Sequence, residues 1–448
     1  MRSHLRSVAA VQASYRETPA DAPVRLAKRT SNLFRSRPAL GAGAGLDVRG
    51  LEDVISVDEE AQTADVQGMC TYERLLEVTL AHGLMPLVVP QLKSITLGGA
   101  VTGLGIESSS LRNGLPHESV LEIDVLTGTG EVVTATPDGH RDLFDAFPNS
   151  YGSLGYALRL KIRLEPVAPY VALRHVRFHG LDELAAAIDT IARTGAWQGE
   201  GVDFVDGVMF DPATAYLSLG TWSTQGEPSD YTGQRIYYRS IAERDRDCLT
   251  VHDYLWRWDT DWFWCSAAFG AQRPLVRRLW PRRYRRSDVY HRIIDLENRY
   301  QVMARLNRRR GAPERERVVQ DIEVPLDQLA DFLAWFDRHV EMSPVWLCPL
   351  RTKRDWPMYP LEPERSYVNV GFWGTVAARP GARDGEVNRA IEAAVARFGG
   401  HKSLYSDVYY DRETFDAMYG GAVFRTVKER YDPDQRFADM YDKVVSGR

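Results

Sequence analysis

Short runs of β-branched and apolar residues, bounded by Gly, Asp, Asn or Pro, recur through the first third of the chain. This pattern is typical of strands that end in tight turns. It predicts strands over residues 51–57, 63–66, 121–126, 132–135 and 156–164. One helix is expected among them, over residues 71–83, because Thr71 can cap it and Leu75, Leu76, Val78 and Leu80 supply an apolar face. Strands and helices do not alternate regularly, which indicates an α+β fold.

Pro166 and Pro169 interrupt the chain after the last of these strands, and prolines rarely continue a central strand. A chain of 448 residues exceeds what one hydrophobic core usually organises. We therefore expect two lobes, one over residues 1–168 and one over residues 169–448. In the second lobe, helices are predicted over residues 181–194, 325–340 and 385–398, and strands over 207–210 and 367–372. Residues 403–448 are dense in Tyr, Phe, Asp and Arg, and we expect them to contribute to an active site.

Charge and cysteine content exclude several classes of function. The net charge is -5, which argues against a protein whose surface binds nucleic acid. The four cysteines are scattered and the histidines do not cluster, so neither a metal site nor a disulfide framework is predicted. No signal peptide or membrane-spanning stretch is evident, so a cytoplasmic location is expected.

The segment over residues 90–114 carries the most informative motif. Gly98, Gly99, Gly103 and Gly105 lie within eight residues and alternate with small or apolar side chains. Glycines at this density let the backbone approach a ligand and direct N–H groups at phosphate oxygens. The spacing matches neither the dinucleotide fingerprint nor the P-loop. The composition alone leaves two interpretations open, an anion cradle and a tight structural turn.

The same segment resembles the flavoproteins of the vanillyl-alcohol-oxidase type, and within them the Δ24-sterol reductase branch. The branch pattern of T-[VL]-G-G, a spacer and G-x-G-I-E-S-S is present over residues 96–109. Similar segments follow in the same order, over residues 153–155, 318–321, 344–349 and 404–415. The resemblance implies a two-lobed α+β fold, in which an FAD-binding PCMH-type domain is joined to a substrate domain.

The resemblance also implies which residues contact FAD. They are Thr96, Leu97, Gly98, Gly99, Gly103, Gly105, Ile106, Glu107, Ser108 and Ser109 in the main segment, and Gly152, Ser153 and Gly155 in a second turn. An earlier pyrophosphate loop would fall on residues 28–32. Glu107 stands where many relatives carry a histidine that bonds covalently to the flavin, so non-covalent FAD is expected. Glu107 would then lie beside the flavin ring, either as a catalytic group or as the cap of a turn.

Members of this branch reduce an isolated carbon–carbon double bond of a lipid, with NADPH as the expected electron donor. Such an alkene has no carbonyl to accept charge, so a proton must arrive before the hydride from flavin N5. The reaction therefore needs an acid whose pKa is raised by an apolar setting, and aromatic walls that stabilise a tertiary cation.

The segment over residues 403–410 is the first candidate for this acid. If it is a strand, Tyr405, Asp407 and Tyr409 share one face, because side chains alternate with period two. The alternative is a half-buried strand whose tyrosine hydroxyls face water. His252, Asp253 and Tyr254 form a second candidate group.

Residues 256–286 combine eight aromatic residues with eight arginines, and no acidic residue lies between Trp262 and Arg286. This composition is typical of a peripheral membrane contact. The alternative is a solvated basic loop over a Trp-rich core.

Two lipid substrates fit the expected chemistry, because the sterol Δ24 bond and a 10-methylene fatty-acyl chain of a phospholipid both give a tertiary cation. The marked excess of Arg over Lys is typical of GC-rich genomes and favours the methylene lipid, for which a methyltransferase is the expected functional partner. Two other classes stay open, an FAD-linked alcohol or sugar-lactone oxidase and a non-catalytic flavin-bearing lipid-binding protein.

Overall fold

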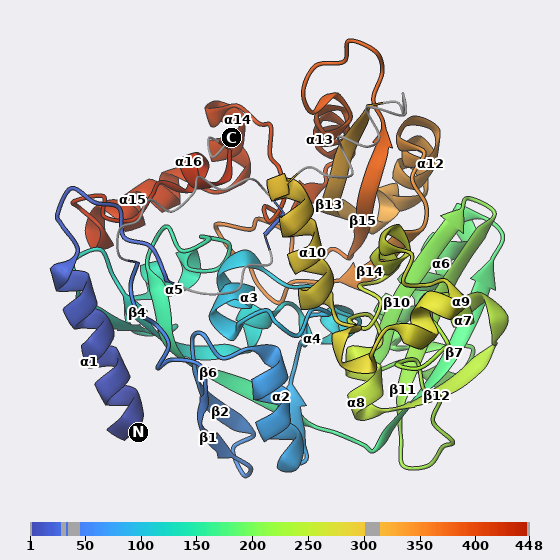
Figure 1. The fold of residues 1–448 in the computed structure, drawn as a ribbon, viewed down its shortest axis with the longest axis horizontal. Helices are drawn as coiled ribbons and strands as arrows, with labels where there is room; N and C mark the ends of the chain where they lie inside the picture. The colour runs from blue at the N-terminus through green and yellow to red at the C-terminus, as the bar shows by residue number, and fades with distance from the viewer. Residues whose placement is uncertain (1, 28–32, 35–44, 301–313, 446–448) are drawn as a thin grey trace.

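The computed structural model describes residues 2–27, 33–34, 45–300 and 314–445. Two antiparallel sheets organise these residues, and each sheet lies in its own half of the molecule (Figure 1). The chain passes from the first sheet to the second between Pro166 and Tyr170, where β6 ends and β7 begins.

The first sheet has six strands in the order β1-β2-β6-β4-β5, and β3 pairs with the far end of β6. Its strands are β1 (Val54–Asp58), β2 (Thr63–Gln67), β3 (Leu84–Pro86), β4 (Val120–Leu126), β5 (Val132–Ala135) and β6 (Tyr156–Pro166). The helices around it are α1 (Arg2–Glu17), α2 (Tyr72–Ala81), α3 (Leu97–Gly103), α4 (Ser110–Asn113), η1 (Pro116–Ser119) and α5 (Arg141–Ala146). As predicted, Thr71 caps α2, and its side chain accepts a hydrogen bond from the N–H of Arg74.

The second sheet has eight strands in the order β12-β7-β11-β10-β14-β15-β13-β16. They are β7 (Tyr170–Phe178), β10 (Phe204–Asp211), β11 (Thr214–Ser223), β12 (Arg246–Thr250), β13 (Arg315–Pro325), β14 (Val345–Leu350), β15 (Tyr367–Ala377) and β16 (His401–Lys402). A separate short pair consists of β8 (Ala196–Trp197) and β9 (Glu200–Gly201). Three helices cover one face through a continuous apolar core: α6 (Leu181–Thr194), α12 (Leu329–Val340, preceded by η4, Leu326–Gln328) and α13 (Glu386–Arg397).

The other face of the second sheet carries polar side chains and is covered by the chain between β11 and β13. This segment contains α7 (Tyr237–Glu243), α8 (Val251–Trp256), η2 (Cys265–Phe269), α9 (Pro274–Leu279), η3 (Arg282–Tyr284) and α10 (Ser287–Tyr300). Its aromatic residues belong to the same hydrophobic cluster as the core of the first lobe. The two lobes therefore share one interior at this face.

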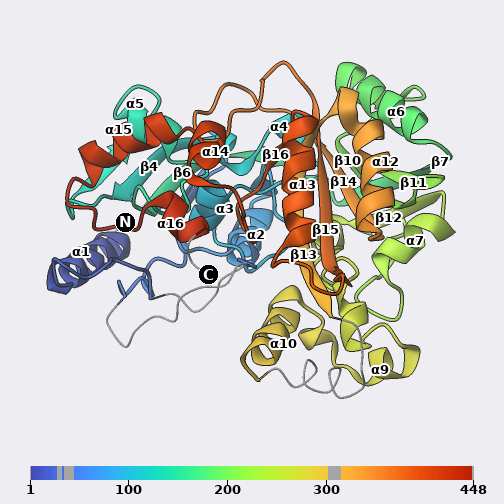
Figure 2. The same cartoon turned by 90° about the horizontal axis from the view of Figure 1, so that it is seen from above.

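The C-terminal helices return to the first lobe. They are α14 (Arg412–Met418), α15 (Gly421–Tyr431) and α16 (Met440–Val444), and α15 lies beside α5 in both views (Figures 1 and 2). The buried ammonium of Lys428 donates to the carbonyl of Ser153 and to the carboxylate of Asp432. Residues at both ends of the chain thus complete the surface around the first sheet.

The predicted strand over residues 403–410 is wrong. Only His401–Lys402 pairs with β13, and the chain then leaves the sheet as an irregular loop. The predicted helices over residues 71–83, 181–194 and 385–398 are confirmed within two residues at each end. No helix of the described residues has the length and apolar character needed to cross a membrane.

Candidate functional site

The glycine-rich segment forms a close backbone contact with the first sheet. Gly98 begins the first turn of α3, and its N–H donates to the carbonyl of Gly68 at 3.0 Å. A Cβ added at Gly98 would lie 2.7 Å from that carbonyl oxygen. Gly98 is therefore required by packing, which is the structural-turn interpretation of this position.

Gly99 has a different environment. The hydroxyl of Thr96 caps α3 by accepting from the N–H of Gly99, and a Cβ added at Gly99 would meet that hydroxyl at 2.9 Å. Apart from the neighbouring residues and the backbone of its own helix, no other heavy atom of the described residues lies within 4 Å of such a Cβ. The backbone of Gly99 is thus open to an incoming group, as the cradle interpretation requires.

The second predicted turn lies directly against the end of α3. The backbone N–H of Tyr151 donates to the carbonyl of Thr102, and its hydroxyl donates to the carbonyl of Gly103, each at 2.9 Å. The neighbouring Ser153 hydroxyl is fully buried and, among the described residues, has no hydrogen-bond partner. A buried hydroxyl without a partner is costly, so a polar ligand atom beside it would be stabilising. These two segments therefore fit a phosphate-bearing cofactor such as FAD.

Glu107 takes part in a buried ion cluster that joins the lobes. Its carboxylate accepts from the Arg257 guanidinium at 2.8 Å, and the same nitrogen donates to Asp206 on β10 at 3.0 Å. The indole N–H groups of Trp258 and Trp346 also donate to Asp206. Burial raises the pKa of Asp206, and the nearby Arg257 opposes that shift. The Glu107 carboxylate is therefore held in place by its ion pair with Arg257.

The candidate group over residues 252–254 divides between surface and interior. His252 is exposed, contacts Asp253 at 3.1 Å and stacks on Trp256. Tyr254 points inward, and its hydroxyl lies 2.8 Å from that of Ser108. The structure therefore does not bring these three side chains together around one atom.

The three predicted acid-cluster residues also have separate partners. The Asp407 carboxylate forms an ion pair with Arg317 at 2.7 Å. Tyr409 packs against Gly385 and lies beneath the Arg389 guanidinium. Because the chain is not a strand here, the shared face predicted for Tyr405, Asp407 and Tyr409 is wrong.

Tyr405 instead joins a carboxyl group that the sequence reasoning did not select. Its hydroxyl accepts from the indole N–H of Trp373 at 2.8 Å and is hydrogen-bonded to Asp321 on β13. Asn369 donates to the same carboxylate at 3.0 Å. Loss of hydration raises the pKa of Asp321 to about 6. The hydrogen bonds from Asn369 and Tyr405 lower this pKa and so limit the shift. Asp321 is therefore an acid with a raised pKa, held in place by two neighbours.

The register of the second sheet explains where Asp321 lies. Side chains alternate along β13, so Val318, Gln320 and Ile322 face the helices while Asp321 and Glu323 face the first lobe. Gly371 is the direct partner of Asp321 on β15, and a Cβ there would lie 2.5 Å from the Asp321 carboxylate. Glu323 is buried on the same face, where burial raises its pKa to about 8.

Aromatic rings surround the Asp321–Tyr405 pair. Phe263 stacks on Trp373 with 4.3 Å between ring centroids, and Trp264 and Trp346 lie close to the same indole. Phe34 packs edge-on against Tyr405. Burial and the nearby charge of Asp321 raise the pKa of Tyr405, and Tyr151, from the turn beside α3, adds a smaller effect in the same direction. Tyr405 packs against the same hydrophobic cluster that contains Tyr151.

Comparisons with known proteins agree with this geometry. Residues 4–136 match the family model described as an FAD binding domain. This match covers most of the first lobe.

Two sterol reductases match most of the chain, and a cytokinin dehydrogenase matches a shorter part. The Delta(24)-sterol reductase of Homo sapiens is 27% identical over 88% of this chain and 76% of its own. That of Arabidopsis thaliana is 25% identical over 90% of this chain and 77% of its own. Cytokinin dehydrogenase 2 of Oryza sativa subsp. japonica is 33% identical, over 39% of this chain and 31% of its own. The protein is thus an FAD-binding oxidoreductase homologous to Δ24-sterol reductases, with the expected α+β fold.

The individual cofactor contacts in the FAD-binding domain stay predictions. The loop over residues 28–32 lies outside the described residues. Ile106, Ser108 and Ser109 are buried, and their neighbour Glu107 is held by Arg257. Ser109 donates to the carbonyl of Leu87, so its hydroxyl supports the segment itself.

Substitution at Gly99 tests the cradle in the FAD-binding domain. Gly99→Val is expected to abolish retention of FAD while far-UV circular dichroism stays unchanged, because the added side chain occupies space next to the open backbone. Gly201→Val is the matched control, since a Cβ there meets nothing within 4 Å. The ratio of flavin to protein absorbance measures both. A normal ratio in Gly99→Val would remove Gly99 from the cofactor site.

Proposed function

We propose that this protein reduces an isolated carbon–carbon double bond of a lipid, with Asp321 as the proton donor. The observation that carries the proposal is a carboxyl group with a raised pKa, hydrogen-bonded to Tyr405 and enclosed by aromatic rings. Bound FAD, once reduced, supplies a hydride at its N5 atom. The protein's own residues then have to deliver the proton and stabilise positive charge on the substrate.

The pKa of Asp321 suits this task. A carboxyl group with a pKa of about 6 is still partly protonated near neutrality, whereas an ordinary aspartic acid is not. The Tyr405 hydroxyl and the Asn369 amide orient the carboxyl, so its proton has a defined direction. The faces of Trp373 and Phe263 are suited to stabilising a tertiary cation by cation–π attraction.

Two substrates meet this requirement equally, a sterol with a Δ24 double bond and a phospholipid with a 10-methylene acyl chain. Relatives are named for the first, and the arginine-rich composition favours the second. We propose NADPH as the electron donor, from the family resemblance. We also propose that FAD is bound non-covalently, because the Glu107 carboxylate stands in the linking position and bonds to Arg257.

Separate measurement of the two half-reactions tests this function. NADPH added under anaerobic conditions is expected to bleach the flavin, and either lipid is expected to restore its colour with one equivalent of reduced lipid. Acid precipitation of the same sample should leave the FAD in the supernatant. Rapid reoxidation by oxygen with stoichiometric peroxide would instead assign an oxidase. A flavin that no reductant bleaches would assign a lipid-binding protein.

A further inference from the structure

Large apolar side chains gather on one exposed surface of the second lobe. Among the described residues, six are recorded as exposed, and four of them lie between residues 275 and 284. Leu275 is 77% exposed and Leu279 83%, and both project from α9. Apolar side chains that are exposed singly need no explanation, but a cluster of this kind marks an interaction site. We call the surface formed by residues 273–284 the α9 face.

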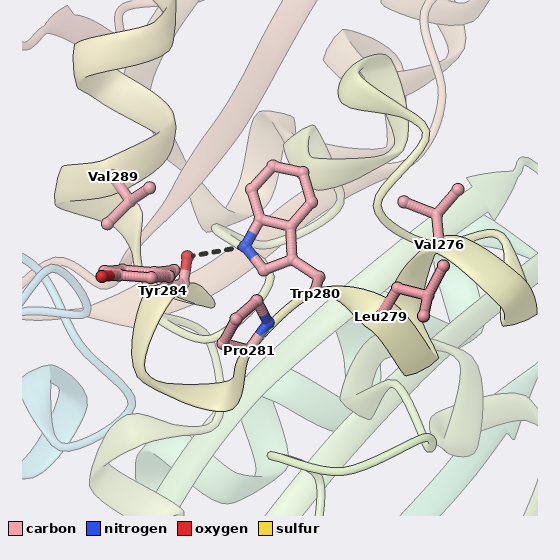
Figure 3. Close-up of a pocket in the computed structure, with 6 residues that line it drawn as sticks. All are labelled: Val276, Leu279, Trp280, Pro281, Tyr284 and Val289. Atoms are coloured by element: carbon pink, nitrogen blue, oxygen red, sulfur yellow. Dashed lines mark hydrogen bonds between the residues drawn. The ribbon is translucent and has the colours of Figure 1, made fainter.

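The α9 face surrounds an apolar hollow. Figure 3 shows the six residues that line this open cavity of about 540 Å³: Val276, Leu279, Trp280, Pro281, Tyr284 and Val289. The indole N–H of Trp280 donates to the carbonyl of Tyr284 at 3.1 Å, so the polar atom of this ring is already satisfied. The hollow therefore offers hydrocarbon contact with little competing polarity.

Arginines border this apolar surface. Arg273, Arg278, Arg282 and Arg283 are exposed, and no acidic residue occurs in the sequence from Phe263 to Arg286. Arg282 lies 3.3 Å from the exposed Asp230, a pair that water and salt screen. Exposed apolar side chains bordered by arginine match a bilayer surface with anionic headgroups.

Buried contacts hold the α9 face in place. The Arg277 guanidinium is buried against Asp261 at 2.6 Å and donates to the carbonyl of Gly233. Arg285 donates to the carbonyls of Thr232 and Gly233. Of the tryptophans in the segment over residues 256–286, Trp258, Trp262 and Trp264 are buried, as the alternative of a Trp-rich core expects, and the membrane contact stays a prediction.

We propose that the α9 face docks the protein on a membrane with anionic headgroups. In Figure 2, α9 and α10 project from the body of the molecule, away from the first sheet. The same segment carries Phe263, which stacks on Trp373 beside Asp321. The segment that meets the bilayer would therefore also supply an aromatic ring beside Asp321. Docking needs no turnover and is therefore independent of the proposed reduction of a lipid double bond.

Vesicle co-sedimentation of the full chain tests the α9 face. Vesicles of phosphatidylcholine with phosphatidylglycerol are expected to bind the protein, and vesicles of phosphatidylcholine alone to bind it much more weakly. The double variant Leu275→Ser with Leu279→Ser is expected to lower affinity about tenfold or more, because both side chains would leave water on docking. The matched control, Leu5→Ser with Val423→Ser, changes the other two exposed apolar residues and should bind normally.

A charge variant tests the second component. Arg273→Gln with Arg278→Gln is expected to reduce binding about fivefold for each charge and to weaken its dependence on salt. Its control is Arg193→Gln with Arg379→Gln, both exposed on other surfaces.

Equal binding to both vesicle types, or normal binding by the leucine variant, would overturn the proposal. A dimer that disappears in the leucine variant, seen by sedimentation velocity, would assign the face to a second copy. Vesicle binding without lipid reduction would refute the proposed function alone.

Discussion

Asp321→Asn is expected to slow reoxidation of the reduced flavin by lipid about 100- to 10,000-fold, while reduction by NADPH keeps its rate. Loss of one positioned general acid typically has an effect of this size. The amide keeps the hydrogen bond from Asn369 but has no acidic proton to give. Stopped-flow absorbance resolves the two half-reactions separately.

Two variants and a pH series complete this experiment. Asp407→Asn is the control, because that carboxylate is paired with Arg317, and it should reoxidise near the wild-type rate. Tyr405→Phe should have an intermediate effect, since Tyr405 positions Asp321 through their hydrogen bond. The wild-type rate with lipid should fall about tenfold for each pH unit above about 6, because only protonated Asp321 is active. If Asp407→Asn slows reoxidation by lipid and Asp321→Asn does not, the proton donor is Asp407 and not Asp321.

Arg257→Met is expected to lower the free energy of unfolding by about 3–5 kcal/mol. The substitution leaves the Glu107 and Asp206 carboxylates buried without their shared cation, and removal of one partner from a buried ion pair has this cost. The loss should be larger at alkaline than at acidic pH, because burial raises the pKa of Asp206 and protonation at low pH neutralises that carboxyl group. Thermal or urea unfolding, followed by circular dichroism, measures it.

Arg379→Met is the matched control, because its side chain is 88% exposed and lies 3.8 Å from Glu386. Its stability should change by less than about 1 kcal/mol. A similarly small change in Arg257→Met would mean that the buried cluster contributes little to the joint between the lobes. Flavin content should be recorded for both proteins, because Glu107 belongs to the glycine-rich segment.

Local patterns predict elements well where one face is apolar and a cap is present. The helix α6 begins and ends at the predicted residues because its apolar positions recur at helical spacing and Gly195 ends it in a left-handed conformation. The helix α2 follows from Thr71 in the same way. The family pattern over residues 96–109 identified the cofactor class without any knowledge of packing.

The loop over residues 403–410 shows where alternation misleads. Its sequence alternates like a strand, but Lys402 is buried and donates to Glu392 and to the carbonyl of Asp407 at 2.7 Å each. These bonds fold the chain back and end its pairing with β13 after two residues. The contacts that one buried lysine makes with the preceding helix and the following loop cannot be read from the alternation of residues alone.

The sequence around Asp321 gives only weak evidence of its role. It lies in a run of β-branched residues, where Gln320, Asp321 and Glu323 are unusual for a buried strand. Such polar residues inside a strand indicate a role, but the partners of Asp321, Asn369 and Tyr405, come from distant segments. The same limit applies to residues 256–286, where only packing separates buried tryptophans from the exposed α9 face.

The C-terminal helices delay completion of the FAD-binding lobe during synthesis. Lys428 donates to the carbonyl of Ser153, in the turn next to the cradle, so this part of the lobe lacks that partner until residue 428 has been synthesised. At about 5–20 residues per second, the ribosome needs on the order of tens of seconds to travel from the end of the first sheet to Lys428. The first lobe therefore stays incomplete during this interval, and cofactor capture is expected to follow synthesis of α15 rather than synthesis of the first sheet alone.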